Sequence, residues 1–465
     1  MARIASAATT LIVLAVVAHQ RGAVELGSVA IGLTVGTLLG AASEGAMGTW
    51  LVREIARAPD CSGRYLSAVL ALRAILLPLT TAVAALFVAK AFPERGPEIM
   101  IVALSIAVQQ VAETGRGVFI AYGRMMVAGV HGTLENLVWL GVILIGLEHG
   151  ASTLDAFGFG LAAMCISSIS IVALAWAFGW PLRLFRRDDV RAMLRELPVF
   201  GAFSLASAAS LRIDTLLIGL LLPTGAVAAA GAYYGATRLV SAFEYLPQTV
   251  GRAILPDVVR ALRSHDASVN QRVTAPAIEI LFTLSVPVPF AMMLGGGWLL
   301  QLLYGPDVTA FGWIMAWLAL ALPFRFIGYL YGALLTGADA QMPRLLALVA
   351  SLVVLLLIDV LTLPTLGIGG AVAGLLCSSL ALFLLYERAM RRAIGHVDSA
   401  RLLVKPLLMA GVATVPALFV RSALPVSLAA PGALVVFGVV YLMLASAYLL
   451  NAVRSRLQGN IDAKS

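Results

Sequence analysis

Fourteen predominantly apolar stretches of about 20 residues follow one another along this chain of 465 residues, and a helix of that length can cross the hydrocarbon core of a bilayer. Only 12% of the residues are charged, whereas a soluble globular protein carries about 25%. We therefore predict an all-α polytopic membrane protein with about 14 transmembrane helices. The predicted spans are 4–20, 27–51, 64–90, 97–121, 127–147, 154–180, 197–221, 227–252, 274–300, 308–335, 344–365, 368–386, 402–421 and 431–451.

The basic residues divide unevenly between the two alternating sets of loops. Of the 32 Lys and Arg residues, only Arg21, Lys90, Arg95 and Arg421 fall in one set, and most fall in the other. Because loops rich in Lys and Arg stay in the cytoplasm, this bias places both termini there. Membrane orientation thus accounts for the net charge of +8, and we expect no nucleic-acid partner. We expect the first stretch to be retained as a helix, since no convincing cleavage site follows it.

The longest basic loop, residues 183–196, separates six predicted helices from eight. Sliding the chain by 204 residues aligns 26–57 with 230–261, and each segment is expected to begin with an outer turn that contains glycine, Gly27 or Gly231. Parallel repeats of helices are a recurring plan of transporters, with the substrate path between the halves. We predict two six-helix lobes in pseudo-twofold arrangement. Their parts are an N-lobe (1–182), a basic cytoplasmic linker (183–196), a C-lobe (197–390) and two additional helices with a tail (391–465).

The seventh and eighth predicted helices carry a series of short motifs. They are Arg-Ile-Asp at 212–214, Gly-Ala-Tyr at 231–233, Ala-Thr-Arg-Leu at 236–239 and Pro256. In order and spacing they resemble the polysaccharide flippases of the multidrug/oligosaccharidyl-lipid/polysaccharide (MOP) exporter superfamily. The first hairpin, 19–32, resembles the glycine turn of that family, although Val29 or Ala30 stands where an aromatic residue is usual. Leu-Val-Arg-Glu at 51–54 resembles the end of its second helix.

The resemblance implies a function. Such proteins move a lipid-linked, pyrophosphate-bearing glycan across the bacterial inner membrane, and fourteen helices favour this branch over the drug-extruding branch, which usually has twelve. The expected protein is a transporter that flips an undecaprenyl-pyrophosphate oligosaccharide by alternating access for cell-surface polysaccharide biosynthesis. Its expected partners are the lipid-linked glycan, membrane lipid, and a polysaccharide polymerase or ligase. The glycan stays open between O-antigen, capsule, exopolysaccharide and lipid II.

Charged side chains inside the spans form the list of functional candidates, because each costs about 2.5–3.5 kcal/mol on insertion scales. They are Arg73, Arg116, Arg212, Arg238, Arg325, Glu44, Glu113, Glu135, Asp214, Glu244, Glu279 and Asp359. This number predicts an internal polar cavity. Arg116 follows Glu113 by three residues on one helical face, which is typical of a structural pair.

Three arginines are the predicted substrate-binding residues: Arg212, Arg238 and Arg325. The planar guanidinium group binds phosphate oxygens in pairs and stays charged when partly dehydrated, which suits a pyrophosphate. The alternative is that neighbouring carboxylates, such as Asp214 or Glu244, neutralise these arginines inside the protein.

Four carboxylates are the predicted ion-coupling residues: Asp214, Glu244, Glu113 and Asp359. A buried carboxylate close to an arginine can exchange a proton or bind sodium, and fixed salt bridges are the alternative. We expect no other cofactor and no metal centre, since the five histidines are scattered without a ligand spacing.

Two other classes of protein compete with the flippase. An ion-coupled drug or metabolite antiporter of the same superfamily would need an acidic or apolar cavity, which five intramembrane arginines disfavour. A membrane glycosyltransferase or polymerase usually needs a large outer loop or a pair of metal-binding acids. The outer loops are short and the adjacent acids Asp188 and Asp189 lie among arginines, so we expect a transporter rather than an enzyme.

Overall fold

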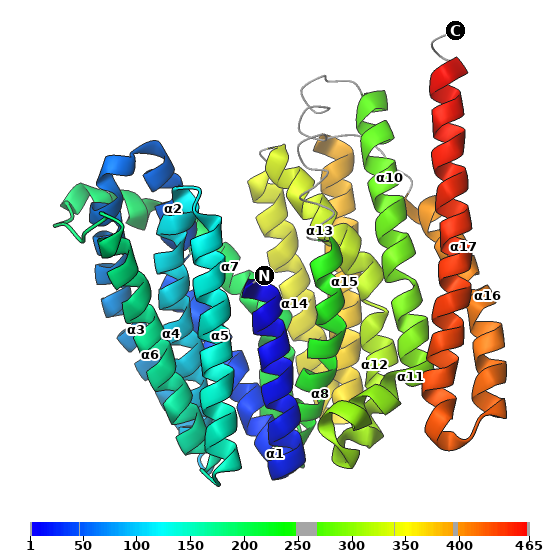
Figure 1. The fold of residues 1–465 in the computed structure, drawn as a ribbon, viewed down its shortest axis with the longest axis horizontal. Coiled ribbons are helices and arrows are strands. Elements are labelled where there is room, and N and C mark those ends of the chain that lie inside the picture. The colour runs from blue at the N-terminus through cyan, green and yellow to red at the C-terminus, as the bar shows by residue number, and fades with distance from the viewer. Residues whose placement is uncertain (1, 46, 248–266, 339, 394–398, 463–465) are drawn as a thin grey trace. The chain divides into compact units, whose positions relative to one another are not determined.

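The computed structural model describes residues 2–45, 47–247, 267–338, 340–393 and 399–462. Within these ranges the chain is almost entirely helical and contains no strand, which confirms the predicted all-α class (Figure 1). Eleven helical spans of the described residues are long and apolar enough to cross a membrane. The chain is therefore a multi-pass membrane protein by the length and composition of its helices.

Three helices, α1, α4 and α8, bring the spans among the described residues to the predicted number of fourteen. The 43 residues of α1 (Ala2–Glu44) would extend for about 65 Å, twice the thickness of a bilayer core. They break into two arms at Gly22, whose φ of 84° and ψ of −179° are accessible to glycine. Two further helices fall outside the eleven: α4 (Gly96–Ala121), with three charged residues, and α8 (Ala226–Ser241), with only 16 residues.

The helices form two compact units. The first comprises residues 1–235 and 356–371, and the second comprises 236–355 and 372–465. The first unit contains α1, α2 (Met47–Arg57), η1 (Pro59–Cys61), α3 (Ser62–Ala91), α4, α5 (Met125–Glu148), α6 (Thr153–Ala177), α7 (Arg187–Leu221), the start of α8 and the end of α14 (Gln341–Leu366). The second contains the end of α8, η2 (Ala242–Glu244), α10 (Ala267–Ser285), α11 (Pro287–Tyr304), η3 (Pro306–Phe311), α12 (Gly312–Ala319), α13 (Leu322–Gly337), most of α14, α15 (Ile368–Ala393), α16 (Ser399–Ala423) and α17 (Val426–Asp462). These units reflect packing, whereas the predicted lobes rest on a sequence repeat and remain a prediction.

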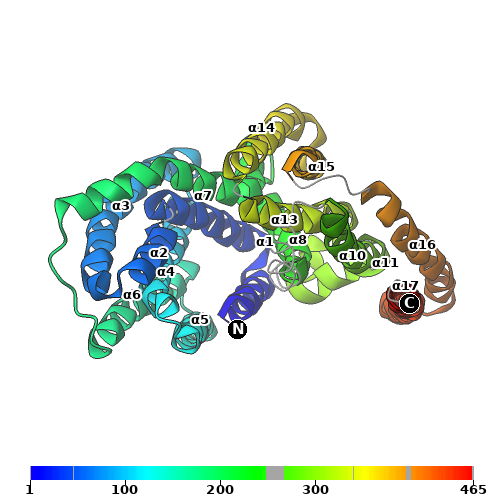
Figure 2. The same ribbon diagram turned by 90° about the horizontal axis from the view of Figure 1, so that it is seen from above.

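Helix α4 is the central element of the first unit. It contacts α1, α2, α3, α5 and α6, and the view from above shows it among them (Figure 2). Gly32, Gly36 and Gly40 of α1 face it, and a Cβ atom on Gly36 would lie 2.7 Å from the carbonyl oxygen of Ala103. This spacing of small residues therefore allows the two backbones to approach closely.

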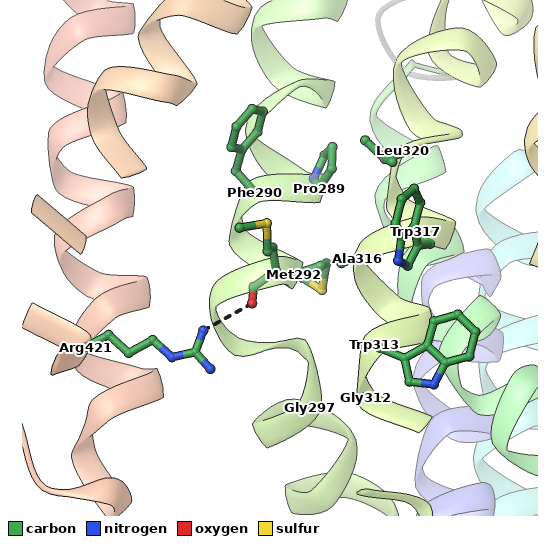
Figure 3. Close-up of a pocket in the computed structure, with 11 residues that line it drawn as sticks. Pro289, Phe290, Met292, Gly297, Gly312, Trp313, Ala316, Trp317, Leu320 and Arg421 are labelled. Carbon is green, nitrogen blue, oxygen red and sulfur yellow. Dashed lines mark hydrogen bonds between the residues drawn. The ribbon is translucent and has the colours of Figure 1, made fainter. Parts of the chain in front are cut away.

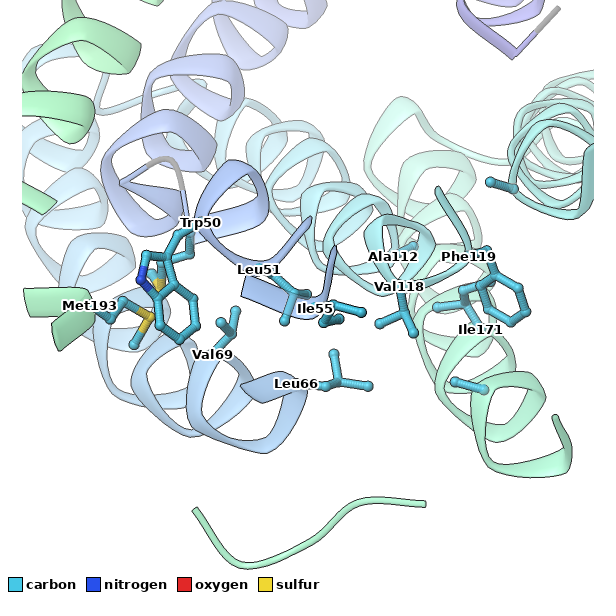
Figure 4. Close-up of a cluster of buried hydrophobic side chains, with 13 residues drawn as sticks. Trp50, Leu51, Ile55, Leu66, Val69, Ala112, Val118, Phe119, Ile171 and Met193 are labelled. Carbon is cyan, nitrogen blue, oxygen red and sulfur yellow. The ribbon is translucent and has the colours of Figure 1, made fainter. Parts of the chain in front are cut away.

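An apolar cluster packs several helices of the first unit together. It joins Trp50, Leu51 and Ile55 of α2 to side chains of α3, α4, α5, α6 and α7, including Phe119 and Met193 (Figure 4). The predicted span 27–51 ends earlier than expected, at Glu44, because Gly45 adopts a positive φ of 50°. The apolar face of the following helix, α2, packs into the cluster.

The predicted linker 183–196 is helical from Arg187 onward, where α7 begins. The Asp189 carboxylate accepts a hydrogen bond from the backbone N–H of Arg186 at 2.9 Å and forms an ion pair with Arg64 of α3 at 2.9 Å. Asp189 is buried. It therefore caps α7 and ties it to α3.

The turns that begin the two aligned segments lie elsewhere than predicted. They fall at Gly22 and Gly225, both with positive φ, and the positions predicted for them, Gly27 and Gly231, lie inside helices. Gly27 and Gly231 contact each other, since a Cβ atom on Gly231 would lie 2.7 Å from the backbone nitrogen of Gly27. The two aligned positions therefore meet in space. Pro256 of the family pattern lies outside the described residues.

Two predicted spans of the second unit are interrupted. The span 274–300 divides into α10 and α11 at Pro287, which cannot donate a helical hydrogen bond. The span 308–335 divides into η3, α12 and α13, with a break before Pro323. The last two helices, α16 and α17, pack against each other and against α11. Tyr441 of α17 donates a hydrogen bond to the carbonyl oxygen of Thr283 on α10 at 2.7 Å.

We predict that Gly231→Ala destabilises the protein, because the new methyl group meets backbone atoms that no rotamer can move. The expected loss is about 1–3 kcal/mol of unfolding free energy, typical of overpacking. Thermal unfolding in detergent measures it. Gly129→Ala is the matched control, since no atom lies within 4 Å of its Cβ position. Equal stability of the two variants would show that the contact of Gly27 with Gly231 does not constrain the fold.

Candidate functional site

The predicted site residues fall into three groups. Arg212 and Asp214 lie on α7 and Asp359 on α14, within the first unit. Arg238, Glu244 and Arg325, on α8, η2 and α13, belong to the second unit. Glu113 lies on α4, in separate surroundings.

Two buried carboxylates interact in the first unit. Asp214 is 3% exposed and Asp359 is fully buried, and Asp214 is the charged group that acts on Asp359 electrostatically. Tyr233 donates a hydrogen bond to Oδ2 of Asp214 at 2.6 Å. No described residue donates a hydrogen bond to either oxygen of Asp359. Because an isolated buried carboxylate is very costly, this pair is suited to hold a proton or a monovalent cation.

Arg212 lies two residues before Asp214 and has a different kind of partner. Its guanidinium carbon lies 4.9 Å from the ring centroid of Tyr234, in a cation–π contact. Within the described part of the chain Arg212 forms no ion pair. Consecutive tyrosines of α8 thus hold the two charges of the Arg-Ile-Asp motif, one each. The positive charge stays available to an anion.

The second unit pairs two of the predicted residues with each other. Arg325 Nε lies 3.1 Å from Oε1 of Glu244, and Tyr329 donates a hydrogen bond to Oε2 at 2.9 Å. Arg325 and Tyr329 are four residues apart, so they share one face of α13. In this conformation Arg325 is neutralised inside the protein, which is the alternative considered from the sequence. Arg238 is half-buried near the end of α8.

Glu113 belongs to a different cluster and its side chain is exposed. Arg73 of α3, which is 2% exposed, donates a hydrogen bond to Thr114, and it interacts electrostatically with Glu44 and Glu113. No described contact joins these residues to Asp214 or Asp359. Glu113 is therefore less suited than the buried pair to bind an ion.

Arg116 forms an ion pair, but its partner is not Glu113 as expected. Arg116 Nη1 forms an ion pair with Glu135 of α5 at 2.9 Å, and Ser167 of α6 donates a hydrogen bond to the same carboxylate oxygen. His131 joins the network through its Nδ1, which lies 3.4 Å from Nη1 of Arg116, and its Nε2 lies 3.0 Å from Oγ of Ser170. The network joins α4, α5 and α6 and has a structural role.

Sequence reasoning missed the tyrosines that hold the charged groups, namely Tyr233, Tyr234 and Tyr329. Tyr233 stands within the Gly-Ala-Tyr motif that carried the family resemblance, so a signal was present for it. Tyr234 had no such signal, because its role depends on which face of α8 meets α7. Tyr329 follows Arg325 by one helical turn, and this spacing could have been noticed.

Comparisons with known proteins identify the fold. No family model matches the chain, and no curated protein matches its sequence. Among solved structures, the lipid II flippase MurJ in an inward closed conformation is similar, with a TM-score of 0.77 and 12% identity over 97% of this chain and 98% of that one. An inward-facing multidrug resistance MATE transporter of the MOP superfamily gives a TM-score of 0.64 and 16% identity over 84% of this chain and 95% of its own. A eukaryotic MATE transporter, AtDTX14, gives 0.55 with 11% identity over 87% and 95%.

These likenesses define the class of the protein by its fold. The chain has the fold of transporters of the MOP superfamily, which is the fold that the family resemblance implied. At 11–16% identity the likeness shows the fold alone. Cargo and coupling must therefore be argued from the residues of this chain.

We predict that Glu244 and Arg325 depend on each other for stability. Glu244→Gln or Arg325→Gln alone removes one charge of a buried ion pair and leaves the opposite charge, which should cost about 3 kcal/mol. The double variant should lose clearly less than the sum, because neither charge remains. Unfolding in detergent of the two single variants and the double variant provides the measurement. Additive losses would show that the ion pair contributes nothing to the folded protein.

Proposed function

We propose that this protein is a flippase that moves an undecaprenyl-pyrophosphate oligosaccharide across the bacterial inner membrane by alternating access, with both termini in the cytoplasm. The observation that carries the proposal is the state of Arg212. It lies half-buried in a spanning helix, stacks on Tyr234, and forms no ion pair with a described residue. Since an intramembrane arginine costs about 2.5–3.5 kcal/mol, one kept without a counter-ion is best explained by an anionic cargo.

The chemistry of a pyrophosphate suits this arrangement. A guanidinium group donates two parallel hydrogen bonds to phosphate oxygens, and stacking on an aromatic ring fixes its plane. Arg238 follows Tyr234 by four residues on α8, so it lies on the same helical face. Arg238 is the second arginine that the proposal assigns to a phosphate. Arg325 is paired with Glu244, so it could bind a phosphate only after leaving that carboxylate.

Ion coupling is assigned in the same proposal to Asp214 and Asp359. Both are buried and lie within electrostatic range of each other, so binding a proton or a sodium ion would lower the cost of their buried charge. Glu244 is engaged by Arg325 and Tyr329, and Glu113 is exposed. Of the four predicted carboxylates, these two are thus the weaker candidates.

A second candidate function is an ion-coupled drug or metabolite antiporter. The buried acids favour it, and several similar structures are multidrug resistance MATE transporters. Two observations favour the flippase. An available Arg212 would repel an organic cation, and the MurJ flippase structure covers 97% of this chain whereas the MATE structure covers 84%.

We predict that Arg212→Gln lowers head-group transfer about tenfold or more, because a charge-assisted, bidentate contact with the pyrophosphate is lost. Purified protein in proteoliposomes would receive a fluorescent undecaprenyl-pyrophosphate oligosaccharide, and an impermeant quencher would report its sidedness. Arg238→Gln should behave likewise. Arg191→Gln is the matched control, since Arg191 is exposed on the same helix and is no site candidate.

The outcomes separate the two functions. Transfer at the wild-type rate in both Arg212→Gln and Arg238→Gln would refute the anion site. No transfer of several glycan lipids, together with gradient-driven efflux of a cationic dye, would establish the antiporter instead.

We predict that Asp359→Asn and Asp214→Asn make transport independent of an imposed proton or sodium gradient, because the amide removes the charge that binds the ion. The measurement compares transfer rates with and without each gradient in the same proteoliposomes. Glu113→Gln should keep the gradient dependence. If Asp359→Asn kept it as well, the buried carboxylate pair would not be the coupling site.

A further inference from the structure

A groove of 580 Å³ runs along α11 in the second unit (Figure 3). Pro289, Phe290 and Met293 of α11 line it, Trp313 and Trp317 project from α12 on one side, and Arg421 reaches in from α16 on the other. Among its described lining residues Arg421 carries the only charge. The volume falls within the range of about 300–1,000 Å³ that is typical of sites for small ligands.

Two of the helices that line the groove come into backbone contact. A Cβ atom on Gly312 of α12 would lie 2.6 Å from Cα of Gly297 on α11, so the helices touch there. Trp313 and Trp317 are four residues apart and therefore form a continuous apolar wall along α12. Apart from Arg421, the groove is thus lined by apolar residues.

The open side of the groove faces the surroundings of the protein. Trp313 is 48% exposed, Trp317 52% and Met293 58%, although all three lie on helices long and apolar enough to span the membrane. Around such helices the surrounding medium is lipid, and tryptophan favours the boundary between hydrocarbon and head groups. An occupant of the groove therefore enters sideways from the bilayer.

Arg421 makes the groove suited to a ligand that carries a negative charge. It stands in the last turn of α16, and its Nη1 makes one long hydrogen bond of 3.4 Å to the carbonyl oxygen of Met293. It forms no ion pair with a described residue. Most of its donors thus remain for an anion at the edge of an apolar groove, and a phosphate attached to a hydrocarbon chain satisfies both.

We propose that this groove binds an anionic membrane phospholipid, with one acyl chain along α11 and its phosphate on Arg421. Under the predicted topology the lipid belongs to the periplasmic leaflet. The proposal does not depend on the cargo, because none of the residues assigned to the pyrophosphate or to the coupling ion lines the groove.

Tryptophan quenching tests the proposal. Purified protein is titrated with phosphatidylglycerol that carries a brominated acyl chain, and separately with brominated phosphatidylcholine. The chain has seven tryptophans, and the double variant Trp313→Phe/Trp317→Phe lacks the two that line the groove. The fluorescence that this double variant loses is the groove component. We expect this component to saturate with phosphatidylglycerol. In Arg421→Gln the affinity should fall about fivefold, as expected for one basic residue at an anionic surface, while that for phosphatidylcholine stays unchanged.

Three further variants complete the test. Arg421→Lys should keep most of the affinity, and Ala316→Phe, which fills the groove, should remove the saturable component. Arg401→Gln is the matched control, because Arg401 is exposed near the other end of α16. Equal affinity for the two lipids in the wild type would overturn the proposal, and so would an affinity for phosphatidylglycerol unchanged in Arg421→Gln. The Arg421→Gln measurement tests the proposal even if Ala316→Phe fails to fold, because the side chain of Arg421 is exposed.

Discussion

The high cost of placing charge and unpaired polar groups in hydrocarbon is the constraint on which this structure depends. It requires the backbone to satisfy its own hydrogen bonds, and so dictates a chain of helices. It also acts on each charged side chain within those helices, which must find a counter-charge, a hydrogen-bond partner, or a ligand. The pairing of Arg116 with Glu135 and of Arg325 with Glu244 follows directly from this requirement.

The same constraint separates structural from functional residues. Arg116 is held by three helices and has no need of a ligand, whereas Arg212 has only an aromatic ring as a described partner. Asp359 is the acidic counterpart of Arg212, because no described residue donates a hydrogen bond to it. Both charges therefore remain costly until something binds, and this makes them better candidates for function than charged residues whose partners are already present.

The apolar runs predicted most span edges to within a few residues, because the thickness of a bilayer fixes the length of a helix that crosses it. The sequence could not reveal how the spans are subdivided. Gly22, Pro287 and the break before Pro323 interrupt helices where local backbone geometry decides, and hydropathy does not record it. The beginning of α7 at Arg187 was missed because its capping by Asp189 is completed by Arg64, which is distant in sequence.

The candidate site was predictable in its charged members and not in their pairing. The Arg-Ile-Asp motif identified Arg212 and Asp214, but the choice of Glu135 over Glu113 as the partner of Arg116 depends on how α4 and α5 are rotated against each other. The tyrosines depend on the contact of α7 with α8 in the same way.

The contact of α7 with α8 also bears on the coupling between ion and cargo. Tyr233 and Tyr234 are consecutive residues of one helix, and they hold Asp214 and Arg212, which are two residues apart on another. A shift of α8 against α7 that moves one tyrosine must move the other. If the proposed assignments hold, an ion at Asp214 and a phosphate at Arg212 each bias the position of the same helix pair. That shared element is what reciprocal coupling between two sites requires.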